Sequence, residues 1–189
     1  MPRQELDALV RAALILVVGA GTLACGPDTR EGTLRRLREE GRAGIVTAEG
    51  RERFSDGEWR KHGSFVFRDD HGEVTTTGSY ENGLETGPWS ETYEDGSKGR
   101  GNYADGSRTG EWRTFHPNGA EQDSGAYDRG LRTGLWISRR PDGTLLREAR
   151  YREGELNGEV VWYGPDGRTW EPQRSGLYED GEKVAPLDR

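Results

Sequence analysis

The sequence predicts an all-β protein in which serial β-hairpin repeats form one elongated antiparallel sheet, preceded by an N-terminal signal segment. Three observations support this prediction. The pattern Tyr-x-x-Gly-x-x-x-Gly-x-Trp recurs about every 23–24 residues, a spacing typical of repeat architectures. An Asp-Gly or Asn-Gly pair, typical of a tight turn, follows each copy, with its glycine seven residues after the Trp position. No segment places apolar residues at helical spacing over a helical length.

Composition restricts how such a chain can pack. Of its 189 residues, 31% are hydrophobic and 29 are glycines, so a thick core rich in Leu and Ile is not expected. The six Trp, seven Tyr and four Phe must supply most of the packing, because aromatic rings bury the largest area per residue. The net charge of −7 argues against a nucleic-acid partner and against docking on anionic lipid through a basic patch. A single cysteine excludes an internal disulfide and a Cys-cluster zinc site.

The first 25 residues contain a short apolar run that ends at this cysteine. Ala12–Ala24 is too short to span a membrane and has the length of a secretory signal. Because the small residue Ala24 directly precedes Cys25, residues 1–25 resemble a bacterial lipoprotein-type signal peptide. Cleavage before Cys25 and diacylation of its sulfur would then anchor the protein to a membrane of the bacterial cell envelope, facing the periplasm or the exterior. A plain secretory signal or a short anchor is the alternative.

Residues 26–50 show no repeat signature and are expected to form a linker. Within them, Thr33 can N-cap a short helix on which Leu34 and Leu37 share a face. A flexible tether, with a short strand at Gly44–Thr47, is the alternative. Residues 182–189 are expected to form a C-terminal tail.

The repeats span residues 51–181 in about five units, and each unit is expected to be one hairpin. In Glu111–Phe115, charged residues alternate with aromatic or small ones, as in a half-buried strand. Pro117–Gly119 then supplies a turn, and Glu121–Tyr127 supplies the return strand. Because a lone hairpin is barely stable in water, consecutive hairpins are expected to pair edge to edge.

This pairing places the repeated aromatic residues in two adjacent rows, with glycines between them that leave room for rings to lie across the backbone. One row contains the tryptophans Trp89, Trp112 and Trp136. The other contains the tyrosines Tyr80, Tyr103, Tyr127, Tyr151 and Tyr178. The rows are expected to be the core of the sheet. Any strip of them that stays exposed is a candidate docking groove for a peptide or a glycan.

The terminal units depart from the pattern, as terminal repeats do when they cap an array. In the first unit, Phe54 and Phe65 stand at the Tyr and Trp positions. In the fifth unit, Val160 stands at the Trp position. Eleven residues, in place of eight, separate Gly167 from Tyr178, which predicts a longer return strand.

The stretch from about Phe54 to Gly181 resembles the membrane occupation and recognition nexus (MORN) repeat, and more closely its bacterial variant in antitoxin-like and lipoprotein chains. The resemblance rests on the Tyr-x-x-Gly, Gly-x-Trp and Asn/Asp-Gly elements in consecutive copies. It implies serial hairpins in an elongated, often curved, single sheet. It also implies a scaffold or binding surface in place of a catalyst.

The sequence offers little that could carry catalysis. Asp69-Asp70-His71 is the one dense cluster of metal-ligating residue types, and it lies at an expected turn, where Asp is favoured for backbone reasons. No metal and no cofactor is therefore expected. Serines such as Ser90 and Ser124 do not lie in a Gly-x-Ser-x-Gly elbow. These observations predict a protein that is not an enzyme.

The leading functional prediction is a non-enzymatic envelope protein, attached to a membrane through acyl chains on Cys25, that presents an extended β-surface to a protein or glycan partner. Two alternatives belong to other classes. One is an antitoxin-like protein that binds and neutralises a toxin, and the other is a hydrolase with an acidic groove. The pattern specifies no oligomeric state.

Overall fold

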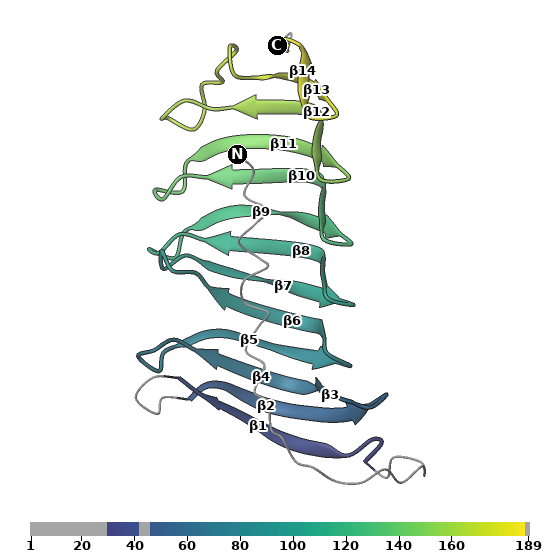
Figure 1. The fold of residues 1–189 in the computed structure, drawn as a ribbon. Helices are drawn as coiled ribbons and strands as arrows, with labels where there is room; N and C mark the ends of the chain where they lie inside the picture. Colours follow the sequence, from purple (N-terminus) through teal and green to yellow (C-terminus); the bar gives the residue numbers. More distant parts are fainter. Residues whose placement is uncertain (1–29, 42–45, 188–189) are drawn as a thin grey trace.

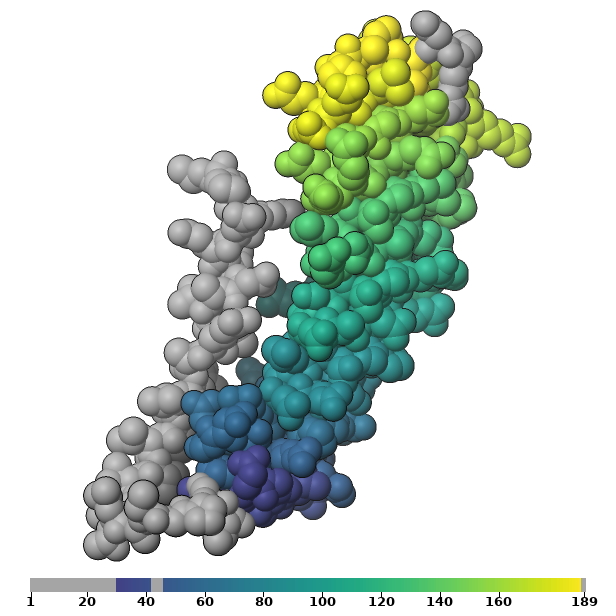
Figure 2. Space-filling model, turned by 90° about the vertical axis from the view of Figure 1, so that its right-hand side faces the viewer, coloured from purple at the N-terminus to yellow at the C-terminus, as the bar shows by residue number. Residues whose placement is uncertain are grey.

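The computed structural model describes residues 30–41 and 46–187. These residues form fourteen β-strands in one open antiparallel sheet, and they contain no helix. The strands follow one another across the sheet in chain order, except that β3 pairs only with β2 (Figure 1). The result is an elongated stack of hairpins (Figure 2). The strands are β1 (Leu34–Glu40), β2 (Val46–Ser55), β3 (Glu58–Lys61), β4 (Gly63–Arg68), β5 (Val74–Glu81), β6 (Leu84–Thr92), β7 (Lys98–Ala104), β8 (Ser107–Phe115), β9 (Glu121–Asp128), β10 (Leu131–Arg139), β11 (Leu145–Arg152), β12 (Glu155–Trp162), β13 (Gly176–Glu179) and β14 (Glu182–Ala185).

The turns that follow the tyrosine positions are two-residue hairpin turns. Both residues have positive φ, as in Asn82-Gly83 with φ of 50° and 85°, which is the type I′ geometry that matches the twist of the flanking strands. The same geometry recurs at Asp56-Gly57, Asp105-Gly106, Arg129-Gly130, Glu153-Gly154 and Asp180-Gly181. The Tyr-x-x-Gly element therefore encodes the hairpin turn, because its glycine supplies the second positive φ.

Arg129 occupies one of these left-handed positions, with φ of 48°, although the conformation suits Asn better. We expect Arg129→Asn to raise the free energy of unfolding by about 0.5–1 kcal/mol. Little is lost in exchange, because the Arg129 side chain is 90% exposed where it pairs with Asp128. Chemical denaturation followed by circular dichroism would measure the change. Arg129→Ala, which has no preference for positive φ, is the control and should not stabilise. A less stable Arg129→Asn variant would contradict the expectation.

The second glycine of each pattern lies at a β-bulge. Gly87, Gly110 and Gly134 have φ of 66°, 64° and 66°, respectively. The pairing register shifts at this level, for example between Thr77 and Ser79 on β5. Bulges bend a strand and increase its twist. The ribbons accordingly change direction near the end of the sheet that carries the two-residue turns (Figure 1).

At the other end of the hairpins, an aspartate or asparagine side chain closes the turn. Asp95 Oδ1 accepts hydrogen bonds from the Ser97 hydroxyl at 2.5 Å and from the Ser97 backbone N–H at 2.9 Å. Asp142 Oδ1 accepts the equivalent pair of bonds from Thr144. These bonds, led by those from the hydroxyl groups, lower the pKa of both aspartates. The glycine of each Asp-Gly pair thus supplies the positive φ of the turn, and the ionised aspartate accepts the hydrogen bonds that close it.

Asp166 gives these turns a pH dependence. It accepts hydrogen bonds from the Thr169 hydroxyl and from the backbone N–H groups of Arg168 and Thr169, which lowers its pKa from 3.8 to about 2. The ionised carboxylate stabilises the fold fully above about pH 4, and this contribution is lost as the pH falls from about 4 towards 2. We expect the difference in melting temperature between the protein and Asp166→Asn to shrink over that range.

Thermal unfolding between pH 5 and pH 2.5 would measure this difference. Asp70→Asn is the control, because the Asp70 side chain makes none of the turn bonds. A difference between the protein and Asp166→Asn that stays constant across the range would contradict the prediction.

The helix expected from Thr33 onwards is wrong, because Leu34–Glu40 forms strand β1 along β2. Leu37 lies opposite Gly50 and packs against the aromatic core, whereas Leu34 is 50% exposed. Residues three apart point to opposite faces of a strand, so the spacing of the two leucines does not indicate a helix here. Residues 26–50 are therefore not only a linker. The strand expected near residue 45 begins at Val46, and residues 42–45 lie outside the described part of the chain.

The longer return strand expected in the fifth unit is also wrong. Strand β13 has only four residues, and the additional residues form a turn in which the Ser175 backbone N–H donates to the Glu171 carbonyl at 3.0 Å. The C-terminal segment expected to be a tail contains strand β14, Glu182–Ala185, at the edge of the sheet.

Candidate binding surface

The repeated aromatic residues form one continuous aromatic ladder, because the two expected rows interdigitate. Neighbouring rings alternate along the sheet at centroid distances of 5.0–6.4 Å, mostly edge to face. Such pairs contribute roughly 0.5–1.5 kcal/mol each beyond the burial of their area. The rings are, in order, Phe65, Tyr80, Trp89, Tyr103, Trp112, Tyr127, Trp136 and Tyr151. We call the side of the sheet that carries them the ladder face.

Each of the three tryptophan rings in the ladder lies on a glycine of the preceding strand. A Cβ atom at Gly101 would fall 1.9 Å from Cε3 of Trp112, so only glycine fits beneath the ring. The contact joins the pairs Gly78–Trp89, Gly101–Trp112 and Gly125–Trp136. In the fifth unit both partners change together: Val160 stands in place of tryptophan, and Ala149, directly opposite it, stands in place of glycine. The smaller side chain of Val160 thus accompanies the larger residue Ala149 at the position where the other units have glycine.

The aromatic ladder ends at Tyr151 among the described residues. Tyr178 lies opposite Gly158, in the same register as the other tyrosines opposite their glycines. No ring at position 160 connects it to Tyr151, because that position is Val160. The prediction that Tyr178 continues the tyrosine row is therefore correct for the register, and within the described residues its ring does not extend the ladder.

Burial makes the aromatic ladder the core of the sheet. The exposed fractions of Trp89, Trp112 and Trp136 are 6%, 1% and 1%. The tyrosines Tyr103, Tyr127 and Tyr151 are only partly buried. A partner could therefore contact the tyrosines but could not stack on the faces of the tryptophans without opening the sheet.

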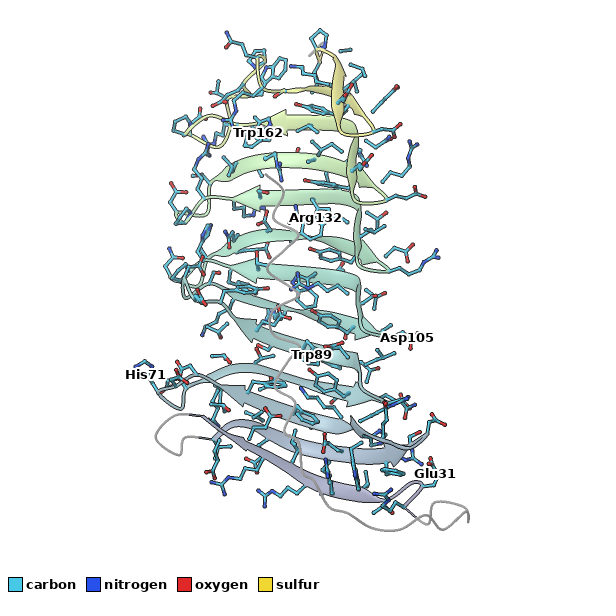
Figure 3. All side chains as sticks on the ribbon, viewed as in Figure 1. Glu31, His71, Trp89, Asp105, Arg132 and Trp162 are labelled. Carbon is cyan, nitrogen blue, oxygen red and sulfur yellow. The ribbon has the colours of Figure 1, made fainter. Side chains whose placement is uncertain are left out.

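Basic side chains cover part of the ladder. The guanidinium of Arg108 lies 4.3 Å from the ring centroid of Trp112, and that of Arg132 lies 4.2 Å from Trp136. Figure 3 shows Arg132 and Trp89 in the middle of the sheet, between the two rows of turns. Cation–π contacts of this kind contribute about 0.5–2 kcal/mol each. These arginines thus help to remove the tryptophans from water.

Arg108 also joins a polar cluster at the end of its unit. Glu91 accepts hydrogen bonds from Arg108 Nη2 at 2.8 Å, from the Tyr93 hydroxyl at 2.7 Å and from the Tyr103 hydroxyl at 3.1 Å. Burial alone would lower the pKa of Arg108, but Glu91 and the two tyrosines raise it above its ordinary value. Burial, followed by Glu91, raises the pKa of Tyr93. The cluster is internally paired and links two neighbouring hairpins.

The cluster of metal-ligating residue types at residues 69–71 lies in a turn, as predicted from the sequence. Asp69 Oδ1 accepts hydrogen bonds from the backbone N–H groups of His71 and Glu73, both at 2.9 Å. His71 itself stands at the end of a hairpin, away from the sheet (Figure 3). Within residues 30–41 and 46–187, no group of three or more His, Cys, Asp or Glu residues could hold a metal ion.

The face opposite the aromatic ladder carries positions that vary from repeat to repeat. The residue directly after each Trp position pairs across the strands with the residue three positions before the next tyrosine, as Ser90 does with Arg100. These positions therefore form a line across the strands. We call this line the outer row, and it consists of Thr77, Ser90, Arg100, Arg113, Ser124, Ile137, Glu148 and Val161. This row was not predicted from the sequence, because the repeated spacing points to the aromatic residues. Because successive side chains of a strand point to opposite faces, the residue after each Trp position could have been assigned to the face opposite the rings.

Two shallow hollows lie on the outer row. The first, of about 630 Å³, is lined by residues that include Ser90, Arg100, Asn102, Glu111 and Arg113. The second, of about 240 Å³, adjoins it. Its lining includes Ser124, Ala126, Leu135 and Ile137. Both hollows share Glu111 and Arg113, so they adjoin each other, and Leu135 and Ile137 line only the second. We call the two hollows together the depression.

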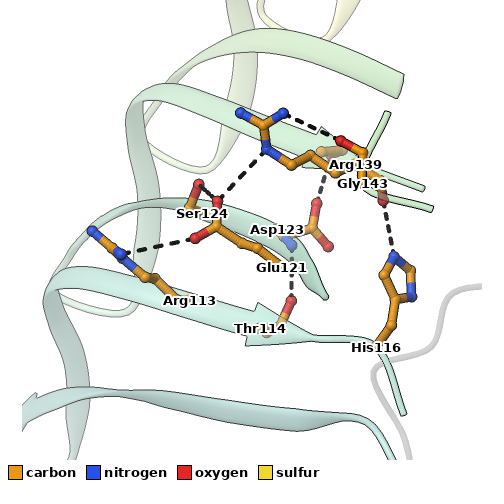
Figure 4. Close-up of polar contacts among 9 residues, drawn as sticks. Arg113, Thr114, His116, Glu121, Asp123, Ser124, Arg139 and Gly143 are labelled. Carbon is orange, nitrogen blue, oxygen red and sulfur yellow. Dashed lines mark hydrogen bonds and ion pairs between the residues drawn. The ribbon is translucent and has the colours of Figure 1, made fainter. Parts of the chain in front are cut away.

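Glu121 partly neutralises the arginines around this depression (Figure 4). Its carboxylate lies 3.8 Å from Arg113 and 3.9 Å from Arg139, and it accepts a hydrogen bond from the Ser124 hydroxyl at 3.0 Å. Arg113 also lies 3.6 Å from Glu111. These arginine–carboxylate distances are longer than those of a direct hydrogen bond, so the ion pairs are loose.

The lipidation site predicted at Cys25 lies outside the described residues. No element of the described ranges is a helix of the length and hydropathy that crossing a bilayer requires. The sequence matches no protein-family model and no curated protein sequence.

Proposed function

We propose that this chain is a non-enzymatic repeat protein, attached to a bacterial membrane through acyl chains on Cys25, that presents its open sheet as a binding surface for a protein or glycan partner. The single observation that carries the binding role is the depression on the outer row. It lies on a face that no second layer of the described chain covers, and it combines polar and apolar lining.

The repeat geometry is consistent with this role. The aromatic ladder supplies the core on one face, and the outer row on the opposite face carries residues that differ from repeat to repeat. Scaffolds built from repeats use such surfaces for recognition. The likeness of the Tyr-x-x-Gly and Gly-x-Trp elements to MORN repeats supports the same role. The apolar run before Cys25 supports the anchor.

Two measurements test the proposal. Intact-mass analysis of the membrane fraction of a producing bacterium should show a chain that begins at Cys25 and carries acyl groups, whereas Cys25→Ser should lack them. An unmodified full-length chain in that fraction would contradict the anchor. The binding role is tested by crosslinking on the outer row: reactive groups at Ser90 should capture a defined partner, and groups at Arg168, in the connection between β12 and β13, should not.

A further inference from the structure

Arg100 and Arg113 lie directly opposite each other on β7 and β8, on the same face of the sheet. Like charges in directly opposed positions of an antiparallel pair destabilise a sheet. Within the described ranges Arg100 makes no ion pair, and its guanidinium instead lies 4.7 Å from the ring centroid of Phe115. The lining of the larger hollow thus contains two opposed arginines, although the protein as a whole carries a charge of −7.

The lining of that hollow has a positive balance. The charged residues of the lining are Arg100, Arg113 and Glu111, two positive and one negative, and Glu121 next to the lining lies 3.8 Å from Arg113, so the positive charge is centred on Arg100. A serine hydroxyl lies on each side of the two arginines, because Ser90 pairs with Arg100 and Ser124 pairs with Arg113 across the strands. Arginine side chains are donors only, and a guanidinium binds a carboxylate through two parallel hydrogen bonds. The hollow therefore has the chemistry of a carboxylate site.

The adjoining hollow has a different chemistry. Leu135 is 42% exposed there, beside Ile137 and Ala126. Leu135 and Ile137 lie on β10, two strands beyond Arg113 on β8, which corresponds to about 10 Å at the usual strand spacing. A peptide in the extended polyproline II conformation advances about 3.1 Å per residue and has three residues per turn, so side chains three positions apart lie on the same side and match that distance.

We propose that the outer row docks an extended acidic segment of a protein partner. A carboxylate side chain of the partner binds Arg100 and Arg113, and an aliphatic side chain three positions away packs on Leu135 and Ile137. The exposed aliphatic residues favour a peptide over an anionic glycan, because a glycan leaves them uncovered. This inference rests on the proposed binding role and specifies its partner and its site.

Labelled nonapeptides with a neutral Ser/Gly background test the site directly. Each contains one Glu and one Leu separated by one to five positions, and fluorescence anisotropy measures binding to the full chain. We expect binding to be tightest at a separation of three. Replacing the peptide Glu with Gln should weaken it at least about tenfold, because hydrogen bonds to a charged group are lost. The double variant Arg100→Gln/Arg113→Gln should weaken it to a similar extent, and Leu135→Ser should weaken it several-fold.

Arg168→Gln is the matched control, since it removes an exposed arginine from the connection between β12 and β13 and should leave peptide binding unchanged. The double variant removes the opposed charges, so its melting temperature should not fall, which separates loss of binding from loss of fold. Three results would overturn the proposal: equal binding of Glu and Gln peptides, no dependence on separation, or binding unaffected by the double variant. Arginine-dependent binding of oligogalacturonate, without peptide binding, would assign the hollow to an anionic glycan instead.

The crosslinking experiment described above distinguishes this inference from the broader function. If the double variant still captures the same partner, the binding role stands and the arginine site is wrong. If capture and peptide binding are lost together, the site is supported. If the protein itself captures no partner at Ser90 while the peptides bind normally, the peptide site stands and the broader function fails.

Discussion

Replacing Trp112 with alanine is expected to lower the free energy of unfolding by about 3–5 kcal/mol. The side chain is 1% exposed and contacts Tyr103 and Tyr127, one on each side. Its removal leaves a cavity in a single-layer sheet and also exposes the backbone of Gly101, which has no side chain to fill the space. The loss should be close to the largest that any single substitution causes in this chain.

Urea denaturation followed by circular dichroism measures the effect without depending on the fluorescence of the residue that is removed. Trp112→Phe is the control, because it keeps an aromatic ring in the ladder and should cost clearly less. Leu84→Ala, at a position that is 49% exposed, should change stability by less than about 0.5 kcal/mol. A loss below about 1 kcal/mol for Trp112→Ala would show that the aromatic ladder is not the core.

Gly101→Ala is the second substitution with a large expected effect, although it adds only one methyl group. The new Cβ would lie 1.9 Å from Trp112, far inside van der Waals contact, so the ring must move. We expect a loss of about 1–3 kcal/mol, the usual range for overpacking. Gly57→Ala is not a suitable control, because φ there is 82°. Ala126→Gly, which removes a methyl group from the opposite face, is a better one and should cost less.

The fifth unit indicates which second substitution should restore the stability lost in Gly101→Ala. Ala149 and Val160 already replace glycine and tryptophan together, and both are almost fully buried. The double variant Gly101→Ala/Trp112→Val should therefore be more stable than the sum of the two single changes predicts, by at least about 0.5–1 kcal/mol. Additive losses in the double-mutant cycle would contradict the proposed coupling between the side chain at position 112 and the residue beneath it at position 101.

The repeated elements of the fold could be predicted from the sequence because each one has a local cause. The Tyr-x-x-Gly turns need positive φ, which glycine supplies, and the Asp-Gly turns close through their own side-chain hydrogen bonds. Neither depends on distant parts of the chain. The all-β class, the serial hairpins and the single sheet therefore follow from local chemistry repeated at a constant spacing.

The parts that could not be predicted depend on contacts between segments. Leu34–Glu40 has a composition suited to a helix, and only its pairing with β2 and the packing of Leu37 make it a strand. The merging of the two aromatic rows into one ladder depends on the bulges at glycines such as Gly110, whose bend the spacing alone does not reveal. The pairing of Arg100 with Arg113 appears only when the register of β7 against β8 is known.

The chain-order arrangement of the strands has a consequence for how the protein forms. Almost every strand pairs with the strands next to it in the sequence, so few distant segments must find one another before stable contacts appear. Proteins whose contacts are local fold faster than β-proteins with distant pairings, because little entropy is lost in closing short loops. Each hairpin can pair with the edge strand of the hairpins that have already formed. The sheet can therefore grow progressively from hairpins that are already formed.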